Sequence, residues 1–240
     1  MDQINEFVDE RQKSWCIHCG EFIESVDSNR DHAPSKILLL KPYPENLPVV
    51  QICKQCNEGF SLDEEYTATF LSCVLTGSTN PDTQCNPRAA LILRKSPNLR
   101  ARIERAKKEY QTLGGETRTV WIPETGRINR IALKNARNHA FFEYGEPMLQ
   151  EPNSIWSAPL ETLTTEQRSE FEKINMEADL AGWPEVGSRM MTRLLTGQDF
   201  SDGWIVIQDG TYQYGVVQHD GILVRSVLFN YLATEVYWAD

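Results

Sequence analysis

Two cysteine pairs with the same spacing constrain this chain more than any other feature. Cys16 and Cys19 form one C-x2-C pair, and Cys53 and Cys56 form a second. In a reducing compartment, repeated pairs of this kind are typical of zinc ligands rather than of disulfides. Four thiolates complete the tetrahedral ligand set of a structural zinc ion. We therefore expect one Zn2+ held by all four cysteines.

The segment around these cysteines has the composition of loops. Residues 14–60 are rich in Cys, Pro, Asn and Asp, and their apolar runs are short. Such a stretch suits a small hairpin tied together by metal, because it is too polar to build a core of its own. Ser61 can then cap a helix, with Glu64 three residues later completing a capping box.

Acid, imidazole and amide side chains lie within this zinc-tied segment. Asp31 and His32 are adjacent, Asn46 lies further along, and Asn57 directly follows the last cysteine. A metal-dependent phosphodiesterase needs a neutral His to deprotonate water and oxygen ligands to hold a hard divalent cation. The Asp31 carboxylate and the Asn57 amide oxygen are suitable ligands, and His32 is a suitable base.

These residues carry a family resemblance. The stretch CIHCGEFIESVDSNRDHAPSKILLLKPYPENLPVVQICKQCNEGFS resembles an HNH endonuclease of the zinc-clipped ββα-metal subclass. The resemblance implies that His32 is the general base, that Asp31 and Asn57 hold a catalytic Mg2+ or Mn2+, and that Asn46 braces the loop carrying the base. It covers about a quarter of the chain, with its parts in the family's order.

The chain departs from the family pattern at two points. The third position of the family motif is Asn57, which can still bind a metal. Many family members carry a Lys about three residues after the last Cys-Asn, whereas this chain has Phe60 and Ser61 there. Lys36 and Lys41 on the intervening loop could replace that phosphate contact, although a Lys in such a position is more often simply solvated.

The net charge of −10 argues against a protein that simply coats nucleic acid, because phosphate contacts need Lys and Arg. The basic residues are nevertheless clustered. Eight of them lie between residues 86 and 112, against two acidic residues. Arg100, Arg102 and Arg105 in this stretch are candidates for nucleic-acid binding. A solvated basic helix face is the alternative.

The predicted fold class is α+β. An N-terminal ββα-metal HNH motif with a four-cysteine zinc site is followed by helices and a small C-terminal antiparallel sheet. The turn sequences Asp209-Gly210 and Asp220-Gly221 indicate hairpins in that sheet. Three regions are expected: a nuclease domain over 1–76, a mainly helical region with basic patches over 77–145, and an α+β region over 146–240. Further expected elements are a helix over about 88–112 interrupted at Pro97, a strand over 117–122, a helix over 128–143 and a linker over 145–159.

These features predict a metal-dependent endonuclease with DNA as the favoured nucleic-acid substrate. The acidic charge also leaves open an effector of an anti-phage or restriction complex, with a sensor or ATPase as protein partner. The alternative from another class is a catalytically silent zinc-knuckle module that binds nucleic acid or protein. We expect a cytoplasmic protein with no membrane association, because the chain has no long apolar run and its start is unlike a secretory signal.

Overall fold

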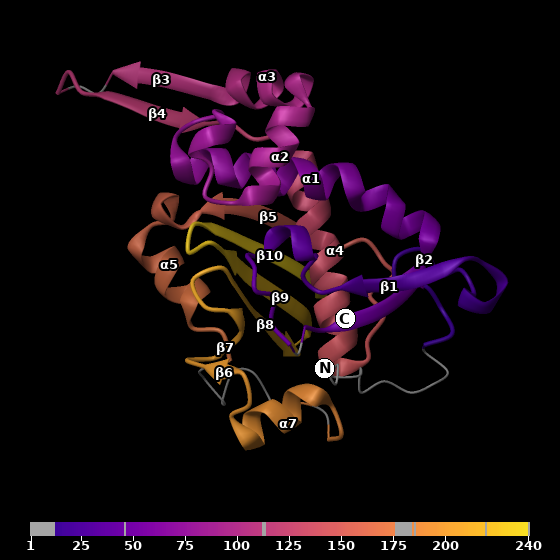
Figure 1. Cartoon of the computed structure of the whole chain (residues 1–240). Coiled ribbons are helices and arrows are strands. Elements are labelled where there is room, and N and C mark those ends of the chain that lie inside the picture. Colours follow the sequence, from indigo (N-terminus) through magenta and orange to yellow (C-terminus); the bar gives the residue numbers. More distant parts are fainter. Residues whose placement is uncertain are drawn as a thin grey trace. The chain divides into compact units, whose positions relative to one another are not determined.

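The computed structural model describes residues 13–45, 47–111, 114–175, 184, 186–218 and 220–239. The chain is mixed α+β, with the helices and strands labelled in Figure 1. It divides into two compact units. One unit combines Met1–Phe60 with Asn129–Asp240, and the other is Ser61–Ile128. The three regions expected from composition stay a prediction. In the described ranges, no helix is long and apolar enough to cross a bilayer.

The zinc-tied segment contains a pair of antiparallel strands followed by a helix. β1 (Ser28–His32) pairs with β2 (Val49–Cys53), and two 3-10 turns, η1 (Ile23–Ser25) and η2 (Lys36–Leu38), lie beside them in sequence. Helix α1 (Lys54–Thr76) starts directly after β2.

The predicted helix start at Ser61 was wrong. The backbone N–H of Cys56 donates to Sγ of Cys53 at 3.3 Å, so a cysteine sulfur accepts a hydrogen bond from an amide that the first turn would otherwise leave unpaired. The second cysteine pair therefore spans the junction of β2 and α1, with Cys53 ending the strand and Cys56 in the first turn of the helix.

The unit Ser61–Ile128 contains most of α1, the turn η3 (Pro81–Thr83), two short helices and a strand pair. Helices α2 (Pro87–Lys95) and α3 (Pro97–Ala106) meet at Pro97, as predicted. The helical stretch ends earlier than expected. β3 (Lys107–Gln111) is a strand because it pairs with the next strand, β4 (Thr117–Trp121), in a hairpin that helix propensity alone does not encode.

The C-terminal sheet is antiparallel, as predicted, and has the strand order β5-β10-β9-β8-β7-β6. Its strands, in chain order, are β5 (Ser154–Pro159), β6 (Phe200–Ser201), β7 (Trp204–Gln208), β8 (Tyr212–Gln218), β9 (Gly221–Leu228) and β10 (Leu232–Ala239). The expected linker thus contains an edge strand. Pro159 is the last residue of β5, a position where no ladder hydrogen bond is lost. The backbone partners of this edge strand come from β10.

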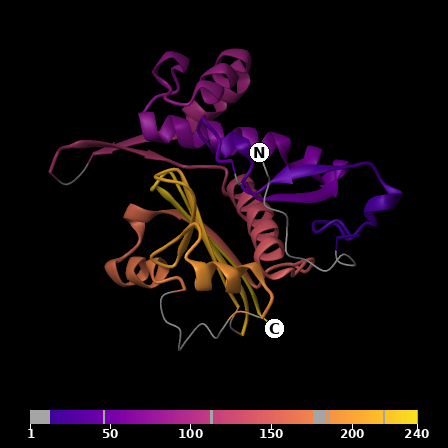
Figure 2. The ribbon, with the colours of Figure 1, turned by 60° about the horizontal axis from the view of Figure 1, so that its bottom comes forward.

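Two helices cover the two faces of this sheet. Residues 129–144 of α4 (Thr125–Tyr144) pack on the face that carries Tyr212 and Tyr214. α5 (Thr165–Glu172), capped by Thr164, packs on the opposite face, where Phe171 contacts Trp204. Figure 2 shows the sheet edge-on between these helices.

A buried polar network joins α4 to the sheet. His139 is fully buried, stacks on Tyr214 with 3.6 Å between ring centroids, and shares a 2.9 Å hydrogen bond with the hydroxyl of Tyr212. Glu143 accepts hydrogen bonds from Tyr214 and from Arg193 of α7 (Arg189–Thr196). Burial lowers the pKa of His139 to about 3, so its ring stays neutral. His139 is therefore a core residue.

The Arg193–Glu143 pair should be important for stability, because removing the guanidinium leaves a carboxylate buried without a counter-charge. Arg193→Met should lower the free energy of unfolding by about 3–5 kcal/mol. The matched control is Arg168→Met in the half-exposed Arg168–Glu172 pair, where a loss under about 1 kcal/mol is expected. Denaturant unfolding measures both variants. Equal losses would contradict a special role for the buried pair.

Candidate functional site

The four predicted zinc ligands converge on one point. Their sulfur atoms, from Cys16, Cys19, Cys53 and Cys56, all lie within 4.8 Å of one another. Sγ of Cys19 is 3.7 Å from Sγ of Cys53. Tetrahedral zinc with thiolate bonds of about 2.3 Å places its sulfur atoms about 3.8 Å apart. The cluster therefore has the ligand type and spacing that a structural zinc ion requires.

Backbone hydrogen bonds shape the first cysteine pair into a tight turn. The N–H of Cys16 donates to the carbonyl of Glu21, and the N–H of Gly20 donates to the carbonyl of Cys16. Gly20 adopts a φ of +74°, which residues with a Cβ rarely tolerate. The turn aims both sulfurs of this pair toward the second pair, which the start of α1 presents.

The electrostatics of the cluster call for a cation. Burial, followed by hydrogen bonding to Cys53 and the charge of Cys16, raises the pKa of the Cys56 thiol. Burial also raises the pKa of Cys19. Four crowded sulfurs cannot all carry a negative charge unless a cation compensates them, and bound zinc deprotonates its thiol ligands. The donor set fits zinc on chemical as well as geometric grounds.

Asp31, one of the two predicted ligands of a catalytic cation, is already bonded to the protein. Its side chain is almost fully buried on the face of β1 that packs toward α4. One carboxylate oxygen lies 2.9 Å from Nζ of the buried Lys134, and the other accepts a 2.7 Å hydrogen bond from Nδ2 of Asn138. The carboxylate is thus neutralised and held by two side chains of α4.

His32 ends β1, and the pleat of the strand directs it to the opposite face from Asp31. Burial, followed by the charge of Lys36, lowers its pKa. Its Nε2 atom is buried and has no hydrogen-bond partner within the described part of the chain. The imidazole is therefore neutral at neutral pH, the form that accepts a proton.

Asn57 lies in the first turn of α1 and donates a 2.8 Å hydrogen bond from Nδ2 to Oδ1 of Asn29. Asn29 and Asp31 are two residues apart on β1 and share a face, about 7 Å apart along the strand. The structure therefore brings Asn57 to the Asp31 side of β1. Asn46 lies outside the described residues.

The predicted nucleic-acid contacts have mixed surroundings. Lys36 and Lys41 both lie near the ring of Tyr43, on the connection between β1 and β2. Arg102 pairs with Glu124, whereas Arg100 and Arg105 lie exposed on α3. Part of the charge of Arg102 is therefore already compensated by a carboxylate.

A hollow of about 640 Å³ adjoins the zinc cluster. Its lining includes Arg130 and Lys134 from α4, together with His18 and Phe60. Burial and the charges of Lys134 and Arg137 lower the pKa of His18 to about 3, and its ring packs edge-on against Phe60. His18 is therefore a neutral packing residue.

Sequence reasoning missed Lys134 and Asn138. The one available signal was their position: they continue the buried face of α4 on which Ile131 and Phe142 lie. A Lys on such a face needs a buried partner, because burying an unpaired charge is costly. The sequence did not show that this partner would be Asp31, 103 positions earlier.

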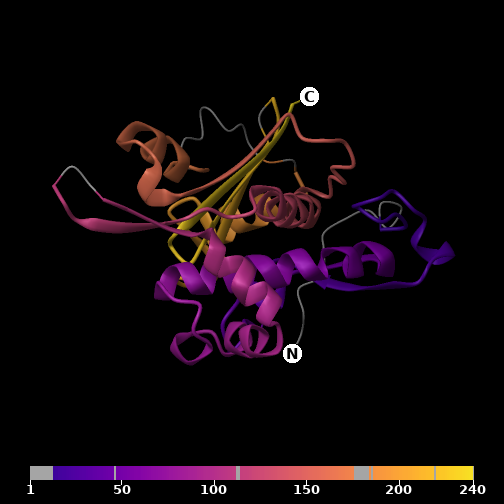
Figure 3. The same cartoon turned by 90° about the horizontal axis from the view of Figure 1, so that it is seen from above.

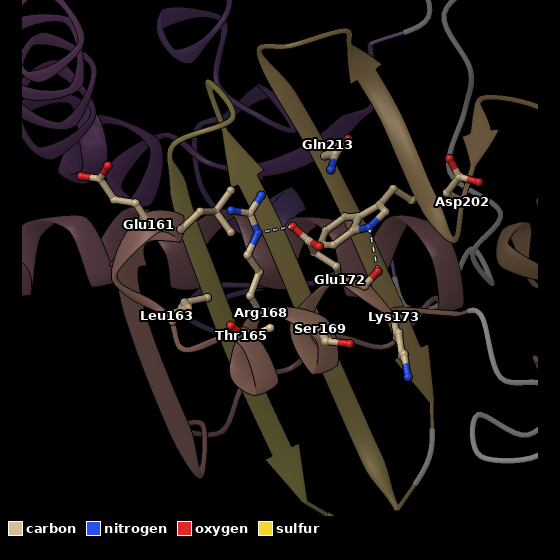
Figure 4. Close-up of a pocket in the computed structure, with 11 residues that line it drawn as sticks. Glu161, Leu163, Thr165, Arg168, Ser169, Glu172, Lys173, Asp202 and Gln213 are labelled. Atoms are coloured by element: carbon tan, nitrogen blue, oxygen red, sulfur yellow. Dashed lines mark hydrogen bonds and ion pairs between the residues drawn. The ribbon is translucent and has the colours of Figure 1, made fainter.

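A second hollow, of about 670 Å³, lies on the α5 face of the C-terminal sheet. Figure 4 shows the Arg168–Glu172 hydrogen bond in this hollow. The Trp204 indole also donates to the carbonyl of Glu172. The hollow contains none of the predicted site residues, and we assign it no chemistry.

Comparison with protein-family models, curated proteins and solved structures returned no match to this chain. The candidate site therefore depends on the geometry described above.

The zinc cluster leads to a stability prediction. Cys53→Ser should abolish stoichiometric zinc binding and strongly destabilise the N-terminal segment, because metal binding to such a site contributes folding free energy. Cys85→Ser is the matched control, since Cys85 is exposed and lies outside the cluster. Elemental analysis and thermal unfolding would measure both. Wild-type protein that folds normally without zinc would rule out a structural role for the metal.

Proposed function

We propose that this protein is an endonuclease of the HNH type, which hydrolyses phosphodiester bonds in nucleic acid, with DNA as the favoured substrate. The observation that carries the proposal is the placement of His32. It is a neutral histidine at the end of a strand whose partner strand leads directly into the zinc ligands. The four-cysteine cluster supports it, because its second pair follows β2, the partner strand of β1. Asn57 lies on the Asp31 side of β1, opposite His32, and does not add to this support.

His32 supplies the proton transfer in this proposal. Its neutral imidazole accepts a proton from water, the resulting hydroxide attacks phosphorus, and the bond to the departing 3′ oxygen breaks. A positioned general base contributes about 10²- to 10⁴-fold to such a reaction. The cluster of thiolates plays no part in this step and holds the strands in place.

The catalytic Mg2+ or Mn2+ fits this arrangement less well than zinc fits the cysteines. The resemblance assigns the cation to Asp31 and Asn57, where it would stabilise negative charge on the phosphate. The Asp31 carboxylate, however, is already neutralised by Lys134 and satisfied by Asn138. The proposed reaction therefore assigns no step to the cation.

The pairing of Asp31 with Lys134 and Asn138 favours a second candidate, the catalytically silent zinc-knuckle module. An Asp31 that fastens β1 to α4 has a structural role that needs no catalysis. Such a module would retain zinc and bind nucleic acid or a protein without cleaving anything. The acidic charge of the chain also suits an effector that works with a sensor or ATPase partner, since self-sufficient DNA-binding proteins are usually more basic.

Cleavage by the His32→Ala variant separates the two candidates. Zinc-loaded wild type should nick plasmid or cut single-stranded DNA with Mg2+ or Mn2+, and His32→Ala should lower the rate by at least about 10²-fold. Gln51→Ala, an exposed change on β2, is the matched control and should keep wild-type activity. Both variants should retain zinc and the wild-type melting temperature. Full activity in folded His32→Ala protein would place the catalytic centre elsewhere.

The pH dependence follows from the lowered pKa of His32. Because only the neutral ring accepts a proton, the rate should rise with pH and level off once the ring is deprotonated. The midpoint of this acidic limb should lie below the ordinary value of 6.5, since burial and the charge of Lys36 disfavour the protonated ring. Lys36→Gln should move the midpoint upward. A rate profile measured at constant ionic strength tests both points, and a midpoint above 6.5 would exclude this environment for the base.

A further inference from the structure

The ribbon formed by β3 and β4 contributes almost no surface to a core. Eight of its ten residues are exposed, including Tyr110 at 50% and Val120 at 44%. In Figure 3 the ribbon extends away from α2 and α3 of the same unit. An isolated two-stranded ribbon is only marginally stable in water, so a partner that covers this exposed strand pair would stabilise it.

The two faces of the ribbon differ in charge. In the observed register Tyr110 lies opposite Arg118 and Lys108 lies opposite Val120, and directly paired residues share a face. These four residues form one side, which we call the cationic face. It carries two positive charges and no carboxylate within the paired strands. On the other side, Glu109 balances the charge of Lys107.

One carboxylate lies close to the cationic face. Glu116, just before β4, is 3.5 Å from Arg118, and both side chains are more than 60% exposed. Exposed pairs of this kind contribute little and are screened by salt, so Arg118 can exchange Glu116 for a stronger anion. Glu116 therefore tunes the positive charge of the face without cancelling it.

The charge of the surrounding chain points to a polyanion as the partner. Residues 88–118 contain nine Lys and Arg residues against three Asp and Glu residues, in a protein of net charge −10. Burying two cations against an apolar protein surface would be costly, whereas phosphates compensate them directly. A two-stranded β-ribbon also has the width to enter the major groove of DNA.

We propose that the cationic face of the β3–β4 ribbon is a docking surface for double-stranded DNA. Lys108 and Arg118 contact backbone phosphates, and Tyr110 and Val120 pack between them against the wall of the groove. This proposal deepens the proposed nuclease function by assigning the substrate class and the element that holds it. It concerns binding alone and does not depend on His32.

Binding is measured by fluorescence anisotropy with a short labelled DNA duplex, across a salt titration and without added divalent cation. All proteins carry His32→Ala, so that cleavage does not interfere. Lys108→Gln/Arg118→Gln should weaken binding at low salt at least about tenfold and make the salt slope shallower by about 2, roughly 0.9 for each lost phosphate contact. Glu116→Gln should strengthen binding.

The matched control removes the same charge elsewhere. Arg168→Gln/Lys173→Gln changes two exposed basic residues of the other compact unit and should leave the slope unchanged. An unchanged slope in the ribbon variant, or an equal loss in the control, would overturn the proposal. Preference for a single strand over the duplex would overturn the assignment of double-stranded DNA. A change of oligomeric state in the ribbon variant, seen by sedimentation, would instead identify the face as a contact between copies of this chain.

Failure of this proposal and failure of the nuclease proposal are distinguishable. If the protein is a nuclease but the ribbon does not bind DNA, Lys108→Gln/Arg118→Gln in the wild-type His32 background cleaves normally. If the ribbon binds DNA but the protein is not a nuclease, DNA binding still depends on Lys108 and Arg118, and neither Mg2+ nor Mn2+ supports cleavage.

Discussion

The convergence of four cysteine sulfurs within 4.8 Å is the constraint on which the N-terminal segment depends. Buried apolar side chains also hold this segment: Ile17, Ile23 and Ile52 pack with Cys16 and Cys53 in one hydrophobic cluster. A zinc ion bound by these sulfurs would link the turn after Trp15 to the junction of β2 and α1. The sulfur of Cys53 also accepts a hydrogen bond from the amide of Cys56 in the first turn of α1. Zinc binding would therefore act on an atom that also helps to start this helix.

Helix α4 is the second organiser of this unit. One part of it presents Lys134 and Asn138 to the carboxylate of Asp31, and the next turns present His139 and Glu143 to the sheet. Each contact is a buried polar group with a specific partner, so a change of register would leave charges unpaired. Such networks favour one arrangement of the strand pair and the sheet over alternatives of similar hydrophobicity.

Asp31 has one observed role, and a second role implied by the family resemblance would compete with it. As a structural residue it ties β1 to α4, and as the ligand implied by the family resemblance it would hold a divalent cation. A Lys ammonium and a divalent cation repel each other at one carboxylate, so the two roles cannot be fulfilled together without movement of Lys134. The two candidate functions therefore differ at one carboxylate: in the binding module Asp31 stays with Lys134, and in the nuclease it would hold the divalent cation.

The sequence by itself determined the elements whose signals are local. The C-x2-C spacing predicted the cysteine cluster, the Asp-Gly turns predicted the C-terminal hairpins, and Pro97 predicted the break between two helices. The sequence also showed that His32 directly follows Asp31, while the strand pleat directs the two side chains to opposite faces of β1. Only the tertiary structure decided what depends on distant partners. The end of the second helix at Ala106 instead reflects a hairpin between neighbouring strands, β3 and β4. The tertiary structure made a strand of the expected linker, because β10 supplies the ladder. It also paired Asp31 with Lys134, since a buried charge takes the partner that folding brings to it, here 103 residues away.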